Sequence, residues 1–208
     1  MFNDEIIEDP TLVKIKDRLT LFALLEEKYF KKFYKYCDLN FPELHSELRD
    51  SRPSFEGWTL LHHAAHGGDV QACAYLIDRG HPIDLVDSAA SLVTPLMLAI
   101  SHNNVEAASK LVQFGALLQK ADIKGENALH YAARDTGIMV KRLIEAAGCT
   151  REEISRLTTA TNVKRKFPED LAVSDVVKDT LLQFRTLGYI PTKVRNLPIK
   201  AKRLVAAK

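Results

Sequence analysis

The stretch Thr59-Leu60-Leu61-His62-His63-Ala64-Ala65 occurs twice more along the chain in altered form. The second copy is Thr94-Pro95-Leu96-Met97-Leu98-Ala99-Ile100, and the third is Asn127-Ala128-Leu129-His130-Tyr131-Ala132-Ala133. The starts at Thr59, Thr94 and Asn127 are nearly evenly spaced. A glycine follows each start at the same offset, at Gly80, Gly115 and Gly148. A regular period of this kind predicts stacked repeats, in which each unit buries its apolar face against the next.

Each copy contains a second apolar segment, so the pattern predicts a pair of helices in every repeat. These segments run over residues 70–77, 105–112 and 139–144. Thr59 and Thr94 stand where a side-chain oxygen caps the free amides of a helix, and Pro95 stands in the first turn, where no amide donor is needed. The glycines suit the left-handed residue that ends a helix.

These motifs resemble those of the ankyrin repeat family, whose unit has a turn, a Thr-Pro-Leu-His-x-Ala-Ala first helix, a second helix and a loop closed by glycine. The first copy departs from this pattern at Leu60, and the second has Met97 in the histidine position. The second also carries a two-residue insertion within residues 88–93. The resemblance implies an all-α, ankyrin-repeat solenoid of stacked helix pairs.

The predicted repeat domain covers residues 51–187 and holds four units. They lie near residues 55–87, 88–122, 123–150 and 160–187. The fourth unit is degenerate. Its start at Phe167 lies further from Asn127 than the other starts lie from each other, so residues 149–166 form a long connection. Within that connection we interpret Lys164-Arg165-Lys166 as an exposed loop.

Residues 1–50 are predicted to form a helical N-terminal capping segment. Apolar residues recur there at intervals of three, four and seven, at Leu12, Ile15, Leu19, Phe22, Tyr29, Phe33 and Tyr36. This spacing places them on one face of a helix. One interpretation is a cap that covers the open end of the solenoid, since terminal units are atypical. The other is that the aromatic residues form a partner site.

Charge is unevenly distributed, although the net charge is only +2. Residues 180–208 contain seven basic residues and no acidic one, which leaves 22 basic and 27 acidic residues in the rest of the chain. Residues 188–208 are therefore predicted to form a basic tail. It is either a solvated extension or, through residues 193–208, a contact for nucleic acid or an acidic surface.

Composition excludes several protein classes. Hydrophobic residues make up 46% of the chain and charged residues 27%, which is ordinary for a folded soluble protein and unlike a disordered one. No apolar run approaches the ~20 residues that a membrane-spanning helix needs. The acidic start does not resemble a secretory signal, and three widely spaced cysteines predict reduced thiols. We expect a cytoplasmic protein, or a nuclear one.

The residues point to no enzyme, cofactor or metal site. His62 and His66 are four residues apart and share a helical face, as metal ligands do, but no third ligand stands at a suitable spacing. His62 and His130 occupy the family's motif histidine, whose ring hydrogen-bonds within the repeat. No phosphate-binding loop or nucleophile motif occurs, and no acid–base pair stands out.

In the ankyrin family, partners dock against the concave side, which is formed by the hairpin tips and the inner helices. Matching this sequence to the family's exposed positions gives a set of candidate partner-binding residues. These are Trp58, His63, His66, Asp87, Ser91, Leu98, Ser101, His102, Lys124, Glu126, Tyr131, Arg134 and Asp135. The set includes tryptophan, tyrosine and arginine, which often anchor interfaces.

The resemblance implies a non-catalytic protein–protein interaction module or adaptor, as a monomer or in a hetero-complex rather than an obligate homo-oligomer. Two alternatives stay open. One is a nuclear, chromatin-associated or nucleic-acid-associated regulator that uses the basic tail, including a reader of methylated lysine. The other is the recognition arm of a larger enzyme assembly. The fold alone does not name the partner.

Overall fold

The computed structural model describes residues 57–135 and 137–187. Within these ranges there are eight α-helices, one short 3-10 helix and no strand, which confirms the all-α prediction. The helices are α4 Leu60–Gly67, α5 Val70–Asp78, α6 Pro95–Ser101, α7 Val105–Gln113, α8 Ala128–Ala132, α9 Ile138–Ala147, α10 Arg151–Thr159, η1 Pro168–Leu171 and α11 Asp175–Leu187. The predicted N-terminal cap and basic tail lie outside the described residues.

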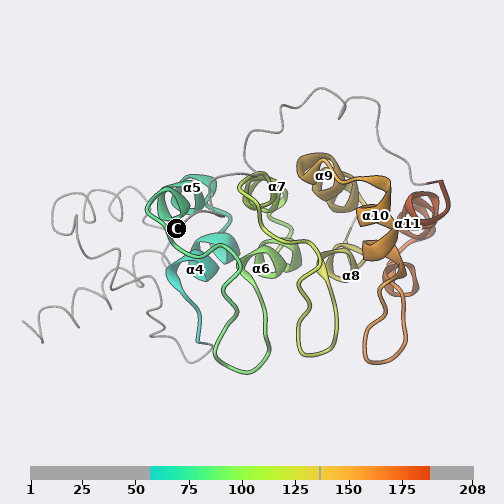
Figure 1. The fold of residues 1–208 in the computed structure, drawn as a ribbon, viewed down its shortest axis with the longest axis horizontal. Helices are drawn as coiled ribbons and strands as arrows, with labels where there is room; N and C mark the ends of the chain where they lie inside the picture. Colours follow the sequence, from blue (N-terminus) through green and yellow to red (C-terminus); the bar gives the residue numbers. More distant parts are fainter. Residues whose placement is uncertain (1–56, 136, 188–208) are drawn as a thin grey trace, which may run out of the picture.

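The helices form two rows, and the chain alternates between them (Figure 1). The inner helices α4, α6 and α8 lie side by side, and the outer helices α5, α7 and α9 form the second row above them. Small side chains line the contacts between the rows. Ala64, Ala65, Ala99, Ala132 and Ala133 are all fully buried. Because these residues are small, neighbouring helices approach closely and share one continuous core.

The predicted start and stop signals act at the helix ends. The Thr94 hydroxyl accepts a hydrogen bond from the Met97 amide at 3.3 Å, at the start of α6. The Asn127 side chain accepts from the Leu129 amide at 3.1 Å, at the start of α8. Gly115, just beyond the end of α7, has φ of 104°, a conformation that a side chain disfavours.

The motif histidines tie two of the three inner helices, α4 and α8, to the next unit. The His62 Nε2 atom lies 3.0 Å from the Val93 carbonyl oxygen, and His130 Nε2 lies 3.2 Å from the Lys166 carbonyl oxygen. A carbonyl only accepts hydrogen bonds, so Nε2 carries the proton in both rings. The Nδ1 atom of His62 in turn accepts from the Thr59 amide at 3.2 Å. Met97 occupies the equivalent place in the second repeat and cannot form these bonds.

The long connection contains a helix that the sequence analysis missed. Helix α10 begins after Thr150, whose hydroxyl accepts from the Glu153 amide at 3.2 Å, while the Glu153 carboxylate accepts from the Thr150 amide at 2.8 Å. This reciprocal pair is a capping box, and its Thr-x-x-Glu pattern was available in the sequence. Ile154 and Leu157 from α10 are buried in the core.

The fourth unit begins with the single turn η1 instead of a full first helix, which agrees with its degenerate sequence. Its second helix, α11, packs against η1 and α10. Arg185 of α11 forms an ion pair with the buried Glu169, and its guanidinium lies 4.0 Å from the centre of the Phe167 ring. Arg185 therefore belongs to the folded body, although its charge was counted with the basic C-terminal region.

We expect His62→Leu to lower the free energy of unfolding by about 2–4 kcal/mol, because the Thr59 amide and the Val93 carbonyl would lose their hydrogen-bond partner at little change in apolar volume. Urea denaturation followed by circular dichroism measures this loss. The matched control is Met97→Leu, at the same position of the second repeat, for which we expect less than about 1.5 kcal/mol. Equal losses in the two variants would contradict a role for the ring hydrogen bonds.

Candidate functional site

The thirteen candidate partner-binding residues differ in exposure. Ser101, His102, Lys124 and Arg134 are exposed, and Trp58, His66, Ser91, Tyr131 and Asp135 are half-buried. The remaining four are buried, with exposed fractions of 8% or less: His63, Asp87, Leu98 and Glu126. The expectation that the whole set stands free on the surface is therefore wrong for these four. Their side chains instead hold the surface in place, or pack within it.

Three hairpin loops project from the same side of the helix rows (Figure 1). They precede α6, α8 and η1, and a buried polar side chain closes each of them, at Asp87, Asp122 and Asn162. The Asp122 carboxylate accepts from the amides of Lys124 at 2.9 Å and Glu126 at 2.8 Å. A buried acceptor that satisfies two loop amides fixes the course of the chain.

The other two loops are closed in the same way. The Asn162 side-chain oxygen accepts from the amides of Lys164 at 2.9 Å and Lys166 at 3.0 Å. The Asp87 carboxylate accepts from the Val93 amide at 3.0 Å. Its second oxygen accepts from the Ser91 hydroxyl. Asp87 thus closes a longer loop, since the two-residue insertion lies between it and Val93.

Backbone hydrogen bonds join neighbouring loops. The Ile123 amide donates to the Ser91 carbonyl at 2.9 Å, and the Val163 amide donates to the Lys124 carbonyl at 2.8 Å. Each bond joins one loop to the loop of the next unit. The three loops are therefore one connected row rather than three independent hairpins.

A charged network lies where the third repeat meets the fourth unit. Arg134, two residues beyond the end of α8, donates to both carboxylate oxygens of Glu126 at 2.7 Å. Asn162 also donates to Glu126, at 3.0 Å. Burial raises the pKa of Glu126, but the hydrogen bonds from Arg134 and Asn162 outweigh it and hold this pKa below the ordinary value of 4.5. Glu126 therefore stays charged at neutral pH.

Tyr131 connects α8 to the same loop. Its hydroxyl donates to the second carboxylate oxygen of Asp122 at 3.0 Å. Burial raises the pKa of Tyr131, and the charge of Asp122 raises it further, so the hydroxyl stays protonated. The Arg134 guanidinium lies 5.7 Å from the ring centre of Tyr131, within the range of a cation–π contact. The predicted residues Glu126, Tyr131 and Arg134 thus lie together.

Sequence reasoning missed Asn162 as a member of this network. The signal was present, because Asn162 precedes the repeat start at Phe167 by the same interval by which Asp122 precedes Asn127. An asparagine in place of the aspartate found in the other loops supplies an N–H donor for Glu126.

A second group of side chains joins the first two inner helices. The Trp58 ring lies 5.3 Å from the His63 ring and 5.1 Å from the His66 ring, measured between centroids. The rings of His66 and His102 are 4.0 Å apart. Aromatic contacts at these distances are attractive. In residues 57–135 and 137–187, no group of three or more histidine, cysteine or acidic residues is arranged to hold a metal ion.

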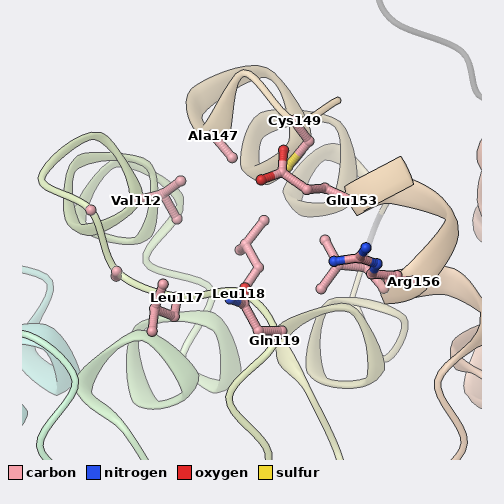
Figure 2. Close-up of a pocket in the computed structure, with 11 residues that line it drawn as sticks. Val112, Leu117, Leu118, Gln119, Ala147, Cys149, Glu153 and Arg156 are labelled. Carbon is pink, nitrogen blue, oxygen red and sulfur yellow. The ribbon is translucent and has the colours of Figure 1, made fainter. Parts of the chain in front are cut away.

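The pockets on the described surface include two of similar volume. One, of about 260 Å³, lies between the second and third hairpin loops and includes Lys124, Glu126 and Asn162. The other, of about 240 Å³, lies beside α7, α9 and α10 and is shown in Figure 2. Glu153 and Cys149 stand on its α9–α10 side and Leu118 faces them.

The two cysteine thiols within residues 57–135 and 137–187 give no sign of activation. Burial raises the pKa of Cys73 to about 12, and the charge of Asp69 adds to this increase. Cys149 is also buried. A catalytic thiol needs the opposite, a lowered pKa with access to solvent.

No helix in the described part of the chain is both long enough and apolar enough to cross a membrane.

Comparison with known proteins agrees with the helix pairs. A family model described as ankyrin repeats, in three copies, matches residues 32–122 and 93–153. The human SMC5-SMC6 complex localization factor protein 1 is 34% identical over 95 residues, which is 45% of this chain and 8% of that protein. The mouse B-cell lymphoma 3 protein homolog is 31% identical over 106 residues, 47% of this chain and 23% of that protein. The chain thus spans less than a quarter of the length of either relative.

The charged network predicts a pH-dependent effect of Asn162→Asp. Aspartate keeps the oxygen that closes the loop, but it replaces the donor to Glu126 by a second negative charge. We expect a loss of about 1–3 kcal/mol in the free energy of unfolding at pH 7. Repulsion raises the folded-state pKa of one carboxyl above its unfolded value, so the penalty is relieved as the pH falls below about 5.

Chemical denaturation of both proteins across this pH range measures the difference. In acid the Glu126 carboxylate becomes protonated, and the wild-type protein then loses the stability that the charged carboxylate contributes. The difference in the free energy of unfolding between wild type and variant therefore becomes smaller still. A variant as stable as wild type at pH 7, or a gap that widens in acid, would show that Asn162 does not serve Glu126 as a donor.

Proposed function

This chain belongs to the ankyrin repeat family, and from that premise we propose that it is a non-catalytic adaptor that binds a partner protein. Ankyrin repeats generally mediate protein–protein interaction. The proposed binding surface, called the inner face below, consists of the inner helices α4, α6 and α8, the residues within two positions of their ends, and the three hairpin loops. It corresponds to the concave side that the sequence analysis assigned to the partner.

The connected row of loops is the observation that supports this proposal most strongly. Hydrogen bonds join the loops to each other, and His62 and His130 join them to the inner helices. Exposed side chains on different units, such as His102 and Lys124, are therefore held at fixed separations. A preorganised surface loses little conformational entropy on binding, so more of its contact energy contributes to affinity.

A binding role also fits the chemistry of the inner face. Its polar groups satisfy each other, as Arg134 satisfies Glu126 and Tyr131 satisfies Asp122. None of these groups is poised to transfer a proton or attack a substrate in the part of the chain that the structure describes. We accordingly propose that the chain is not an enzyme.

The similar proteins are compatible with an adaptor. One of them is, by its name, a localization factor for a complex, and bringing a complex to its place is a task for a binding protein. We propose a cytoplasmic or nuclear location, and a monomer or hetero-complex as the working form. The alternative of a nucleic-acid-associated regulator rests on the basic tail, and it requires binding that weakens steeply with added salt.

A paired-variant experiment tests the inner face. Trp58→Ala combined with His102→Ala removes two rings from it, and Glu106→Ala combined with Arg142→Ala alters the outer helices α7 and α9. We expect the inner-face variant to weaken partner affinity more than about tenfold, because aromatic residues carry much of the binding energy in interfaces. We expect less than about a twofold change for the outer-helix variant.

The partner is first identified by affinity capture with cross-linking, and the dissociation constants of the purified complexes are then measured by calorimetry. Arg134 is left intact because its removal would leave the buried Glu126 carboxylate without its main partner and confuse binding with stability. Circular dichroism verifies that both variants are folded. Unchanged affinity in the inner-face variant, or a loss confined to the outer-helix variant, would refute the proposal.

A further inference from the structure

The pocket between the second and third hairpin loops carries the most specific chemistry on the inner face. Its volume is about 260 Å³, and its rim carries the side chains of Lys124, Lys164 and Lys166. We propose that this basic pocket binds an acidic segment of the partner protein in which apolar residues alternate with the acidic ones. The inference rests on the proposed adaptor function and names the chemistry of the partner.

Loop closure places the lysines. The amides of Lys164 and Lys166 are bound by Asn162, and the amide of Lys124 is bound by Asp122. The Lys124 carbonyl accepts from the third loop at 2.8 Å, which brings the two loops together. The backbone is thus fixed at all three lysines, while their side chains extend into solvent.

The positive charge of the rim is not neutralised within the described chain. The three lysine ammonium groups form no ion pair with its carboxylates, and Arg165 in the same loop is also exposed. Glu126 is the acidic group in the pocket, and Arg134 and Asn162 already bind its carboxylate. Three positive charges around one pocket favour an anionic ligand, since mutual repulsion of the lysines is relieved on binding.

Apolar side chains alternate with these charges. Ile123 immediately precedes Lys124, and Val163 immediately precedes Lys164, at equivalent points of the two loops. Their exposed fractions are 58% and 69%, which is high for apolar residues of this size. A segment with alternating acidic and apolar residues would cover both side chains and pair with both lysines.

The same pocket suits a peptide better than a phosphate group. The Nη2 atom of Arg134 already donates to both carboxylate oxygens of Glu126, so the charge of the guanidinium is largely balanced within the pocket. The Glu126 carboxylate would also repel a compact dianion that entered the pocket. No aromatic side chain lines this pocket in the described residues, and single-stranded nucleic acid would need one for base stacking. Spaced carboxylates on a peptide can reach the rim without approaching Glu126.

The test uses the full chain and a fluorescein-labelled peptide made of Glu-Glu-Leu units, followed by fluorescence anisotropy. The pocket variant is Lys124→Glu combined with Lys166→Glu. The matched control is Lys141→Glu combined with Arg142→Glu, two exposed positions on α9 that change the net charge equally. We expect the pocket variant to weaken peptide binding at least about tenfold and the control less than about threefold. Thermal unfolding checks that both are folded.

Four further outcomes decide the proposal. A peptide of Gln-Gln-Leu units is expected not to bind, because it lacks the carboxylates. The proposal is overturned if wild-type protein does not bind the acidic peptide, or if the pocket variant binds it as well as the control does, which would move the site to another basic region. It is also overturned if inorganic phosphate or single-stranded DNA binds more tightly at the same lysines.

Failure here is distinguishable from failure of the proposed adaptor function. If the acidic peptide does not bind at the pocket but the Trp58→Ala and His102→Ala variant still weakens partner binding, only the pocket assignment is wrong. Binding of the peptide at the lysines, with a partner that docks away from the inner face, would keep the pocket as a site for acidic peptides but would contradict both the inner face and the pocket as docking sites for that partner.

Discussion

A hydrogen-bonded row of loops is the constraint on which the inner face depends. Hairpin loops of this length have many accessible conformations, and ordering them loses conformational entropy. Here each loop wraps around one buried acceptor. At two of the three junctions between neighbouring units, a neutral histidine also bonds the inner helix to the residue that precedes the next repeat start. Loops that would otherwise fluctuate become part of a rigid surface.

The second junction stays connected without a motif histidine. Met97 is buried where His62 and His130 stand in the neighbouring repeats, so it fills the volume without supplying a donor. The Ile123 amide bonds to the Ser91 carbonyl across this junction. The third junction has both kinds of link, through His130 and through Val163. Connection between loops therefore survives at every junction, although the bonds differ.

The sequence predicted features that depend on near neighbours. The helix pairs, the cap at Thr94 and the left-handed Gly115 follow from residue type and a fixed spacing. The burial of Glu126 was not predictable in this way, because its partners Arg134 and Asn162 lie 8 and 36 residues away. Helix α10 lay in a segment without a repeat match, and only its capping box marked it. The location of the candidate site thus stays a prediction, and the sequence did not reveal the long-range contacts of its residues.

Hydrogen exchange of the loop amides tests the central claim most directly. Ile123 and Val163 have exposed side chains, so side-chain burial cannot slow the exchange of their backbone amides. Slow exchange of these two amides therefore reports the hydrogen bonds between the loops. If the loops form one rigid row, both amides exchange at least about a hundredfold more slowly than in an unstructured peptide. Exchange at the unstructured rate, beside protected helices, would mean that the loops move independently and that the inner face is not preformed.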